Sequence, residues 1–182
     1  ELAVGTGWPY PGGANNTTIT GCTFTGMTPS GGDAHGWGIV LAVLSDGFTF
    51  TNNTISNNVD SWGLLLWATD NFSVTDNTWT GGAYTYSACA PYVGDDQTIN
   101  AGETDSGTIS RNTFTGVNQT GTYKADGHLI SINGGVDDSR PIKRVTIADN
   151  QFTASNAKGG TVLAVYNAEN ITVERNKIYS NY

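Results

Sequence analysis

The sequence has few basic residues, few cysteines and no long apolar run. Lys and Arg together number 8 against 16 acidic residues, and the formal net charge is −8. Nucleic acid and membrane surfaces are therefore disfavoured as partners, because both attract clustered Lys and Arg. No stretch is long and apolar enough to cross a bilayer as a helix. The two cysteines, Cys22 and Cys89, leave open one disulfide or two buried thiols.

Thr, Asn and Gly are abundant instead, which is typical of many short strands and turns rather than long helices. A chain of 182 residues suits one domain with a substantial core. The sequence begins with Glu1 and shows no signal peptide. We therefore expect a mature secreted or cell-surface protein, or a piece excised from a larger one.

A short pattern recurs six times along the chain. It consists of an apolar residue, two small or polar residues, usually an Asn, one further residue and a second apolar residue. The interval between equivalent Asn residues is 24 from Asn53 to Asn77 and 26 from Asn150 to Asn176. The six segments are residues 19–24, 50–55, 74–79, 109–114, 147–152 and 173–178.

A repeat of this length, built from short strands, predicts a solenoid in which each coil buries its neighbour. Stacked at about 4.8 Å, each Asn amide can bond to the next and close the turn. Cys22 replaces Asn in the first coil, where such a ladder would end. The alternative is a meander of antiparallel hairpins, which does not require the same polar residue at each turn. We predict an all-β fold, with a solenoid of about six coils over residues 19–182 and a cap or extended lead-in over residues 1–18.

A second strand is expected between successive ladder segments. These runs are apolar at consecutive positions, so both faces of the strand should be covered. Val40, Leu65 and Trp67 are expected to point outward, where a loop, another domain, another subunit or a bound glycan would cover them. The five runs are residues 38–44, 63–67, 97–101, 128–132 and 161–166.

Residues 63–67 and 71–79, with their counterparts along the chain, resemble the repeat of the pectate-lyase-like superfamily. This superfamily includes polysaccharide lyases, polygalacturonases, epimerases and phage tailspikes. The similarity covers nearly all of residues 19–182 and implies a single-stranded right-handed parallel β-helix. It is specific for the fold and weak for the activity, because one scaffold hosts many functions.

Long insertions are expected at one edge of the solenoid, between the ladder strand and the apolar strand. They are residues 25–36, 81–96 and 115–127, and a fourth, residues 134–143, follows an apolar strand. Loops on a rigid scaffold are where binding and catalysis concentrate. In the second insertion, Tyr84, Tyr86 and Tyr92 would either stack on sugar rings or pack the loop onto the solenoid.

Acidic residues and histidines recur at the start of the apolar strands, and coil stacking would bring them into one cleft. Glycoside hydrolysis needs paired carboxylates, one as general acid and one as base or nucleophile. The alternative is that each is an ordinary turn residue bonded to its own backbone. The predicted catalytic residues are Asp60, Asp95, Asp96 and His128, and the predicted substrate-binding residues here are His35 and Asp126.

The order of residues 58–60, 95–96, 127–128 and 140–143 is similar to the motif order of polygalacturonase-type hydrolases. The resemblance implies that Arg140 and Lys143 contact substrate. Leu129 stands where that family has a second glycine, and the basic pair comes one coil early. No convincing aspartate set for calcium accompanies the basic stretch, so we predict no cofactor.

Three functions follow from these features. The first is a glycoside hydrolase or polysaccharide lyase with an acidic cleft. The second is a non-catalytic glycan-binding, adhesive or structural module of a larger surface protein, with self-association or an adjoining domain on the apolar outward face. The third and last is an ice-binding solenoid, suggested by recurrent Thr-x-Thr pairs. In each glycan case a neutral polysaccharide fits as well as pectin, because a chain of net charge −8 repels polyuronates.

Overall fold

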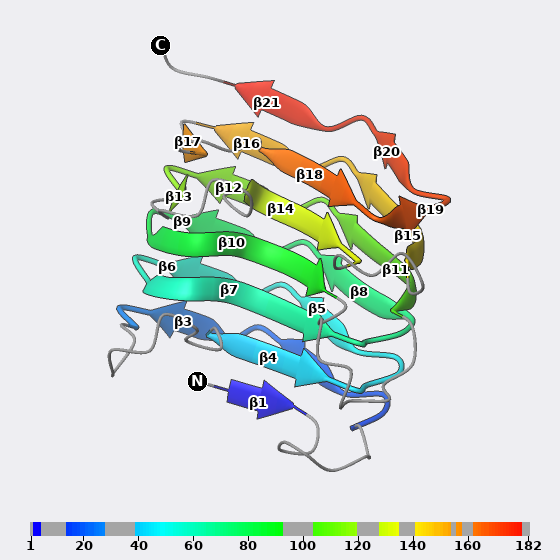
Figure 1. Ribbon diagram of the computed structural model, residues 1–182. Coiled ribbons are helices and arrows are strands. Elements are labelled where there is room, and N and C mark those ends of the chain that lie inside the picture. The colour runs from blue at the N-terminus through cyan, green and yellow to red at the C-terminus, as the bar shows by residue number, and fades with distance from the viewer. Residues whose placement is uncertain are drawn as a thin grey trace.

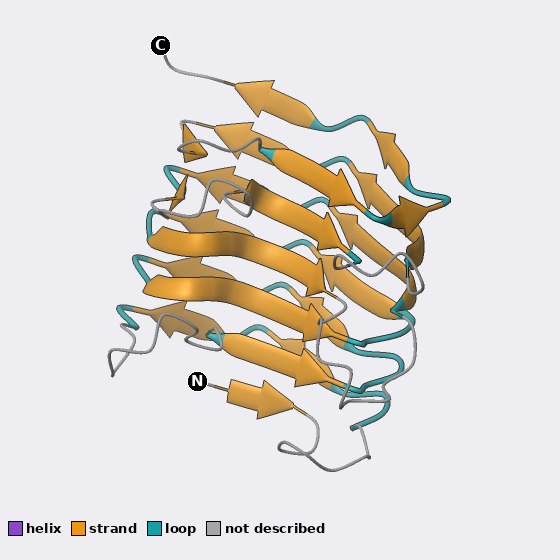
Figure 2. Ribbon diagram, in the orientation of Figure 1, coloured by secondary structure: helices purple, strands orange, loops and turns teal. Residues whose placement is uncertain are grey.

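The fold is a parallel β-helix. A computed structural model describes residues 2–4, 14–27, 39–92, 104–119, 128–134, 141–153, 156–157 and 162–179. In these residues every strand pairing is parallel, and the chain winds through three sheets, A, B and C, in turn (Figure 1). Strands and turns account for all of them and no helix occurs (Figure 2), so none of these residues belongs to a helix that could span a membrane. The prediction of an all-β, right-handed solenoid of about six coils is confirmed.

Each coil contributes strands to all three sheets. Sheet A contains β1 (Leu2–Val4), β4 (Val40–Val43), β7 (Val59–Trp67), β10 (Ala83–Tyr92), β13 (Asn118–Gln119), β14 (His128–Asn133), β17 (Asn156–Ala157) and β18 (Leu163–Tyr166). Sheet B contains β2 (Thr18–Thr20), β5 (Thr49–Thr51), β8 (Phe72–Thr75), β11 (Asp105–Ser110), β15 (Ile142–Ala148), β19 (Ala168–Glu169) and β20 (Thr172–Glu174). Sheet C contains β3 (Thr23–Thr25), β6 (Thr54–Ser56), β9 (Thr78–Thr80), β12 (Thr113–Thr115), β16 (Gln151–Thr153) and β21 (Lys177–Tyr179).

The Asn ladder lies at the corner between sheets B and C. Asn77 is buried, and its Oδ1 accepts hydrogen bonds from the backbone N and the Nδ2 of Asn53, at 2.9 and 3.1 Å. Its own Nδ2 donates to the carbonyl of Phe50 in the preceding coil and to Oδ1 of Asn112 in the next, at 2.9 and 3.0 Å. Every polar atom of the amide is therefore paired, as a buried polar group requires.

Each coil turns this corner on a single residue in the left-handed backbone region. In four successive coils that residue is Asp76, Arg111, Asp149 and Arg175, with φ between 54° and 58°. In the first coil it is Gly21, followed by Cys22, whose backbone N donates to Oδ1 of Asn53 at 2.9 Å. The ladder begins at Cys22 as predicted.

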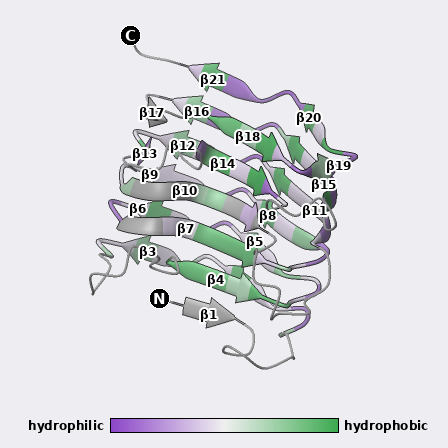
Figure 3. Cartoon of the chain, viewed as in Figure 1, coloured by the Kyte–Doolittle hydropathy of each residue, from purple (hydrophilic) through white to green (hydrophobic). Residues whose placement is uncertain are grey.

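The core is a column of inward-facing side chains that stack coil upon coil. In sheet C, Trp79, Phe114 and Phe152 are in register, and adjacent rings stack at centroid distances of 4.7 and 4.9 Å. Phe50 of sheet B packs obliquely on Trp79 at 6.3 Å. In Figure 3, β4 and β18 have the hydrophobic colour, whereas the corners between the sheets have the hydrophilic colour.

Sheet A is apolar on both faces, but the residues that point inward differ in part from those predicted. Val40 and Leu64 belong to the interior core, so the expectation that Val40 points outward is wrong. The outward cluster is Leu41 and Leu65, with Val43 and Trp62 packed against it. Because the apolar residues are consecutive, the sequence has no alternation that would distinguish inward-facing from outward-facing positions. Because Leu41 and Leu65 are buried within the single chain, they need no second copy to cover them.

The predicted insertions also require correction. Most of the expected loop 81–96 is strand β10, which occupies this coil's place in sheet A. The expected strand at residues 97–101 lies outside the described residues. Strand β10 was not predicted because it consists of small and aromatic residues with a proline and has no aliphatic run. Lys143, expected in a loop, is the second residue of β15.

The cysteines should differ sharply in reactivity. Both are free thiols, Cys22 exposed and Cys89 buried, and burial raises the pKa of Cys89 to about 12. Because the thiolate is the reactive form, an aromatic disulfide reagent at pH 8 should titrate one thiol in the folded protein and two after denaturation. Cys22→Ser should abolish the native signal. Two thiols titrated at equal rates in the native state would contradict this arrangement.

Candidate functional site

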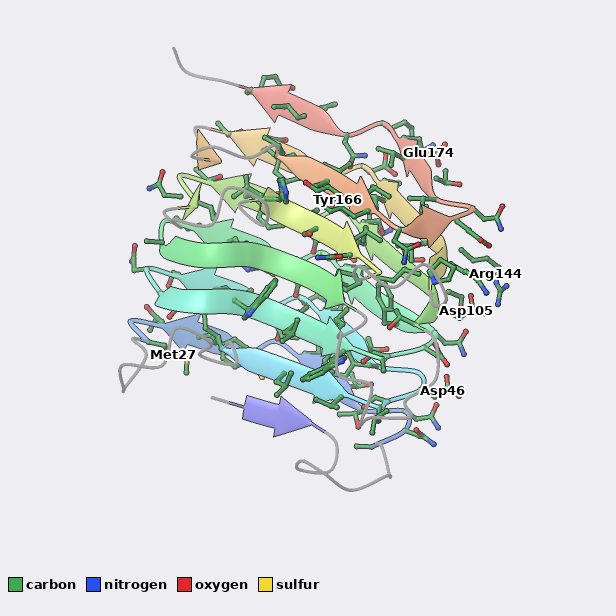
Figure 4. All side chains as sticks on the ribbon, in the orientation of Figure 1. Met27, Asp46, Asp105, Arg144, Tyr166 and Glu174 are labelled. Carbon is green, nitrogen blue, oxygen red and sulfur yellow. The ribbon has the colours of Figure 1, made fainter. Side chains whose placement is uncertain are left out.

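The outer face of sheet A carries the candidate site. Leu64, Ile130 and Ile132 belong to the interior core, and Leu129 does too, so the inward–outward alternation is interrupted at the start of β14. Tyr166 follows Val165, the register partner of Ile132, and therefore lies on the outer face. In Figure 4 its label lies over β18, in the sheet that faces the viewer.

His128 and Tyr166 form the central contact of this face. His128 opens β14 and is only 3% exposed, whereas Tyr166 ends β18 in the next coil and is 42% exposed. The Tyr166 hydroxyl lies 2.8 Å from Nε2 of His128, and the two rings are tilted at a centroid distance of 5.5 Å. The contact fixes the imidazole and leaves a large part of the phenol ring accessible to a ligand.

Tryptophans continue the face toward the N-terminal coils. Trp62 is in register with Ser87, which is in register with His128. Trp67 lies in the row that ends at Tyr166, because Trp67, Tyr92, Asn133 and Tyr166 are successive register partners. Trp62 is half-buried and Trp67 is buried. The outer face therefore combines aromatic surface with hydrogen-bonding groups, an arrangement suited to an amphipathic ligand.

Of the predicted catalytic residues, the structure places His128 fully and Asp60 by its backbone. Asp60 is in β7, two residues before Trp62, and is in register with Tyr84 of β10. Asp95 and Asp96 lie outside the described residues. The paired-carboxylate hypothesis stays a prediction.

Four of the predicted substrate-binding residues are described, and they lie in two different sheets. Tyr84, Tyr86 and Tyr92 belong to strand β10 of sheet A, not to a loop. Lys143 lies in sheet B, in register with Asp105 and Glu169, and is thus on a different sheet from His128. His35, Asp126 and Arg140 lie outside the described residues.

Charged side chains stack at the corner before four of the ladder Asn residues, Asn77, Asn112, Asn150 and Asn176. Arg111 donates from Nε and Nη2 to the two carboxylate oxygens of Asp76, both at 2.7 Å. Arg175 donates to Asp149 in the same bidentate way, at 2.8 and 2.9 Å. These arginine hydrogen bonds hold the pKa of both carboxyls below the usual range. Hydrogen bonds to Asp149 and then to Glu174 raise the pKa of Arg175.

A second charged row occupies the corner between sheets A and B. The backbone N of Asp105 donates to the carboxylate of Asp70 at 2.5 Å, and Asp105 pairs with Arg144. Asp46 and Asp70 form an isolated parallel bridge at the same corner. Figure 4 shows Asp46, Asp105 and Arg144 along this edge of the solenoid. In the described part of the chain, no group of three His, Cys, Asp or Glu residues is arranged to hold a metal ion.

Comparison with known proteins places the chain in a family. Residues 10–134 match the family described as "Periplasmic copper-binding protein (NosD)". No curated protein and no solved structure matches. The match covers more than half of the chain, and its β-helix confirms the predicted resemblance to the pectate-lyase-like superfamily at the level of fold. The chain belongs to the NosD family of parallel β-helix proteins.

Proposed function

We propose that this chain is a binding module that holds a neutral glycan along the outer face of sheet A. The observation that supports it best is the His128–Tyr166 contact, which leaves an accessible aromatic ring beside fixed hydrogen-bonding groups. Sugar rings present an apolar face and a rim of hydroxyls, and they pair with surfaces of this kind. The row that leads back to the half-buried Trp62 offers a further contact toward the N-terminal coils.

The location is outside the cytoplasm. The family description calls its members periplasmic, which accords with the expected export of the chain. Secretion and display on the cell surface are finer alternatives and stay proposals. The net charge of −8 favours a neutral glycan over a polyuronate.

Copper binding comes to this chain from the family description alone. Copper in proteins is held by imidazole, thiolate or thioether groups that converge on one point. Within the described residues, His128 is engaged with Tyr166, Cys89 is fully buried in the core, and Cys22 is exposed at the first coil. These residues do not fit a copper centre, and the proposed function does not include the metal.

The binding proposal predicts an effect specific to Tyr166. Retention of the wild-type chain on insoluble neutral polysaccharides should weaken about ten-fold in Tyr166→Ala, equivalent to about 1.4 kcal/mol. Tyr166→Phe keeps the ring and should lose less. Tyr179→Ala is the matched control, because Tyr179 is 51% exposed but belongs to sheet C.

Three results would count against binding at this face. They are wild-type protein that passes unretained over every polysaccharide, equal losses in Tyr166→Ala and Tyr179→Ala, and soluble cleavage products. Products that disappear in Asp96→Ala would instead establish the hydrolase or lyase hypothesis.

A further inference from the structure

The outer face of sheet C carries a regular array of hydroxyl groups. In its first four strands, β3, β6, β9 and β12, the middle residue packs in or against the core, so the first and third residues point outward. All eight outward residues are Thr or Ser, six of them exposed and two partly exposed. They are Thr23, Thr25, Thr54, Ser56, Thr78, Thr80, Thr113 and Thr115.

Strand pairing arranges these hydroxyls in two rows. Strands β3 and β6, β6 and β9, and β9 and β12 are in register at all three residues. One row runs from Thr23 to Thr113 and the other from Thr25 to Thr115. Neighbouring residues are thus about 4.8 Å apart along a row and about 6.6 Å apart between the rows.

Unequal coil lengths do not disturb this face. Successive ladder positions in the first four coils are 31, 24 and 35 residues apart, yet the strands of sheet C remain in register. The difference is taken up elsewhere, because β4, β7 and β10 of sheet A have 4, 9 and 10 residues. The Asn ladder and the buried column of Ile55, Trp79 and Phe114 fix the strands from within. Figure 1 shows β3, β6, β9 and β12 one above another.

The array has neither charged nor aromatic side chains, although the chain as a whole has a net charge of −8. One border of the face consists of small residues in the left-handed backbone region, Gly26, Asn57, Gly81 and Gly116. Sheet A differs, because its outer face presents the ring of Tyr166. Sugar rings pair with aromatic surface, which the array lacks, so a neutral ligand without apolar rings fits it better.

Threonine at these positions suits ordered water. Its β-branched side chain is stiff at χ1, so the hydroxyl positions are held by the backbone. A hydroxyl donates and accepts hydrogen bonds, as each water molecule in ice does. The two spacings of the array are close to repeats of the oxygen lattice of ice. Within the array, Ser56 Oγ donates to Thr25 Oγ1 at 3.0 Å.

The corresponding rows of sheet B are less suitable. Thr49, Thr51, Ser73 and Thr75 are each partly buried. The hydroxyls of Thr51 and Thr75 lie 3.1 Å apart and hydrogen-bond to each other. Sheet C therefore offers the more accessible of the two hydroxyl arrays.

We propose that the outer face of sheet C, from β3 to β12, is an ice-binding surface. The array is interrupted in β16 and β21, where Gln151, Lys177 and Tyr179 stand in the two rows. Chains adsorbed through this face pin the growing crystal surface, which lowers the freezing temperature and leaves the melting temperature unchanged. This activity uses a different sheet from the proposed glycan site and does not depend on it.

Nanolitre osmometry tests the proposal by measuring the gap between the melting and freezing temperatures of a single ice crystal. The wild-type chain should open a gap and give faceted crystals. Thr78→Lys should remove the gap, because a long charged side chain at the centre of the array breaks its contact with the crystal. Thr18→Lys is the matched control and should retain the gap, since Thr18 is exposed but lies in sheet B. Both variants should keep the circular dichroism spectrum of the wild type.

A wild-type chain that opens no gap and leaves ice crystals unfaceted would overturn the proposal. Equal losses in Thr78→Lys and Thr18→Lys would do the same. Retention on a crystalline polysaccharide that Thr78→Lys abolishes, with no effect on ice, would assign this face to a glycan instead. Tyr166→Ala should leave the gap unchanged, which separates this proposal from the glycan site on sheet A.

Discussion

Phe114→Ala should lower the free energy of unfolding by about 3–5 kcal/mol, the range for truncation of a large buried aromatic side chain. Phe114 is 0% exposed and lies between Trp79 and Phe152, with stacked rings on both sides. Its loss opens a cavity in the middle of the solenoid, where the neighbouring coils are held in register by strand pairing and cannot collapse into it.

Urea unfolding followed by circular dichroism measures the change. Thr115→Ala is the matched control, since Thr115 is the next residue of β12, is exposed and should change stability by less than about 0.5 kcal/mol. Similar losses in both variants would show that the strand has the opposite phase. A change in the slope of the free energy of unfolding against urea concentration would indicate that coils unfold separately, as they can in repeat proteins.

The ladder strands were predictable from the sequence because their signal is repeated and chemically specific. A short strand in sheet B, a corner and a short strand in sheet C recur with Asn in the same place, and only a stacked arrangement uses that Asn five times. The structure gives Asn53, Asn77, Asn112 and Asn150 the same hydrogen bonds.

Sheet A was predicted less well because its strands vary in composition and length. The four-residue β4 and the ten-residue β10 occupy equivalent places. Apolar runs reveal β4 and β14, whereas Tyr, Ser, Ala and Pro fill β10. Position in the coil, rather than local propensity, makes β10 a strand, because β7 and β14 flank it on both sides.

The candidate site was predicted in part. His128 was identified as a site residue, but Tyr166 was read only as the end of an apolar strand. Their contact depends on the register between β14 and β18, which sequence spacing does not give. The alternating corner charges are visible in the sequence, as Asp or Arg directly before successive ladder Asn residues, but their pairing was not predicted.

Asn77→Ala should lower the free energy of unfolding by about 1–3 kcal/mol through unsatisfied buried groups rather than lost volume. The change removes the acceptor for Asn53 and the donor to Phe50 and Asn112. Asn53 and Asn112 are each 1% exposed, so water cannot easily replace these partners. The penalty thus falls on two neighbouring coils and on the backbone of the corner.

Asn176→Ala is the matched control for the ladder. Among the described residues, Asn176 receives hydrogen bonds only from Asn150, and its own Nδ2 donates to the carbonyl of the exposed Glu174. Its replacement should therefore cost less than that of Asn77, which thermal melting of the two variants can compare directly. Equal shifts in melting temperature would mean that burial in the ladder adds nothing to stability. An unchanged melting temperature for Asn77→Ala would mean that strand pairing and apolar stacking alone hold the coils together.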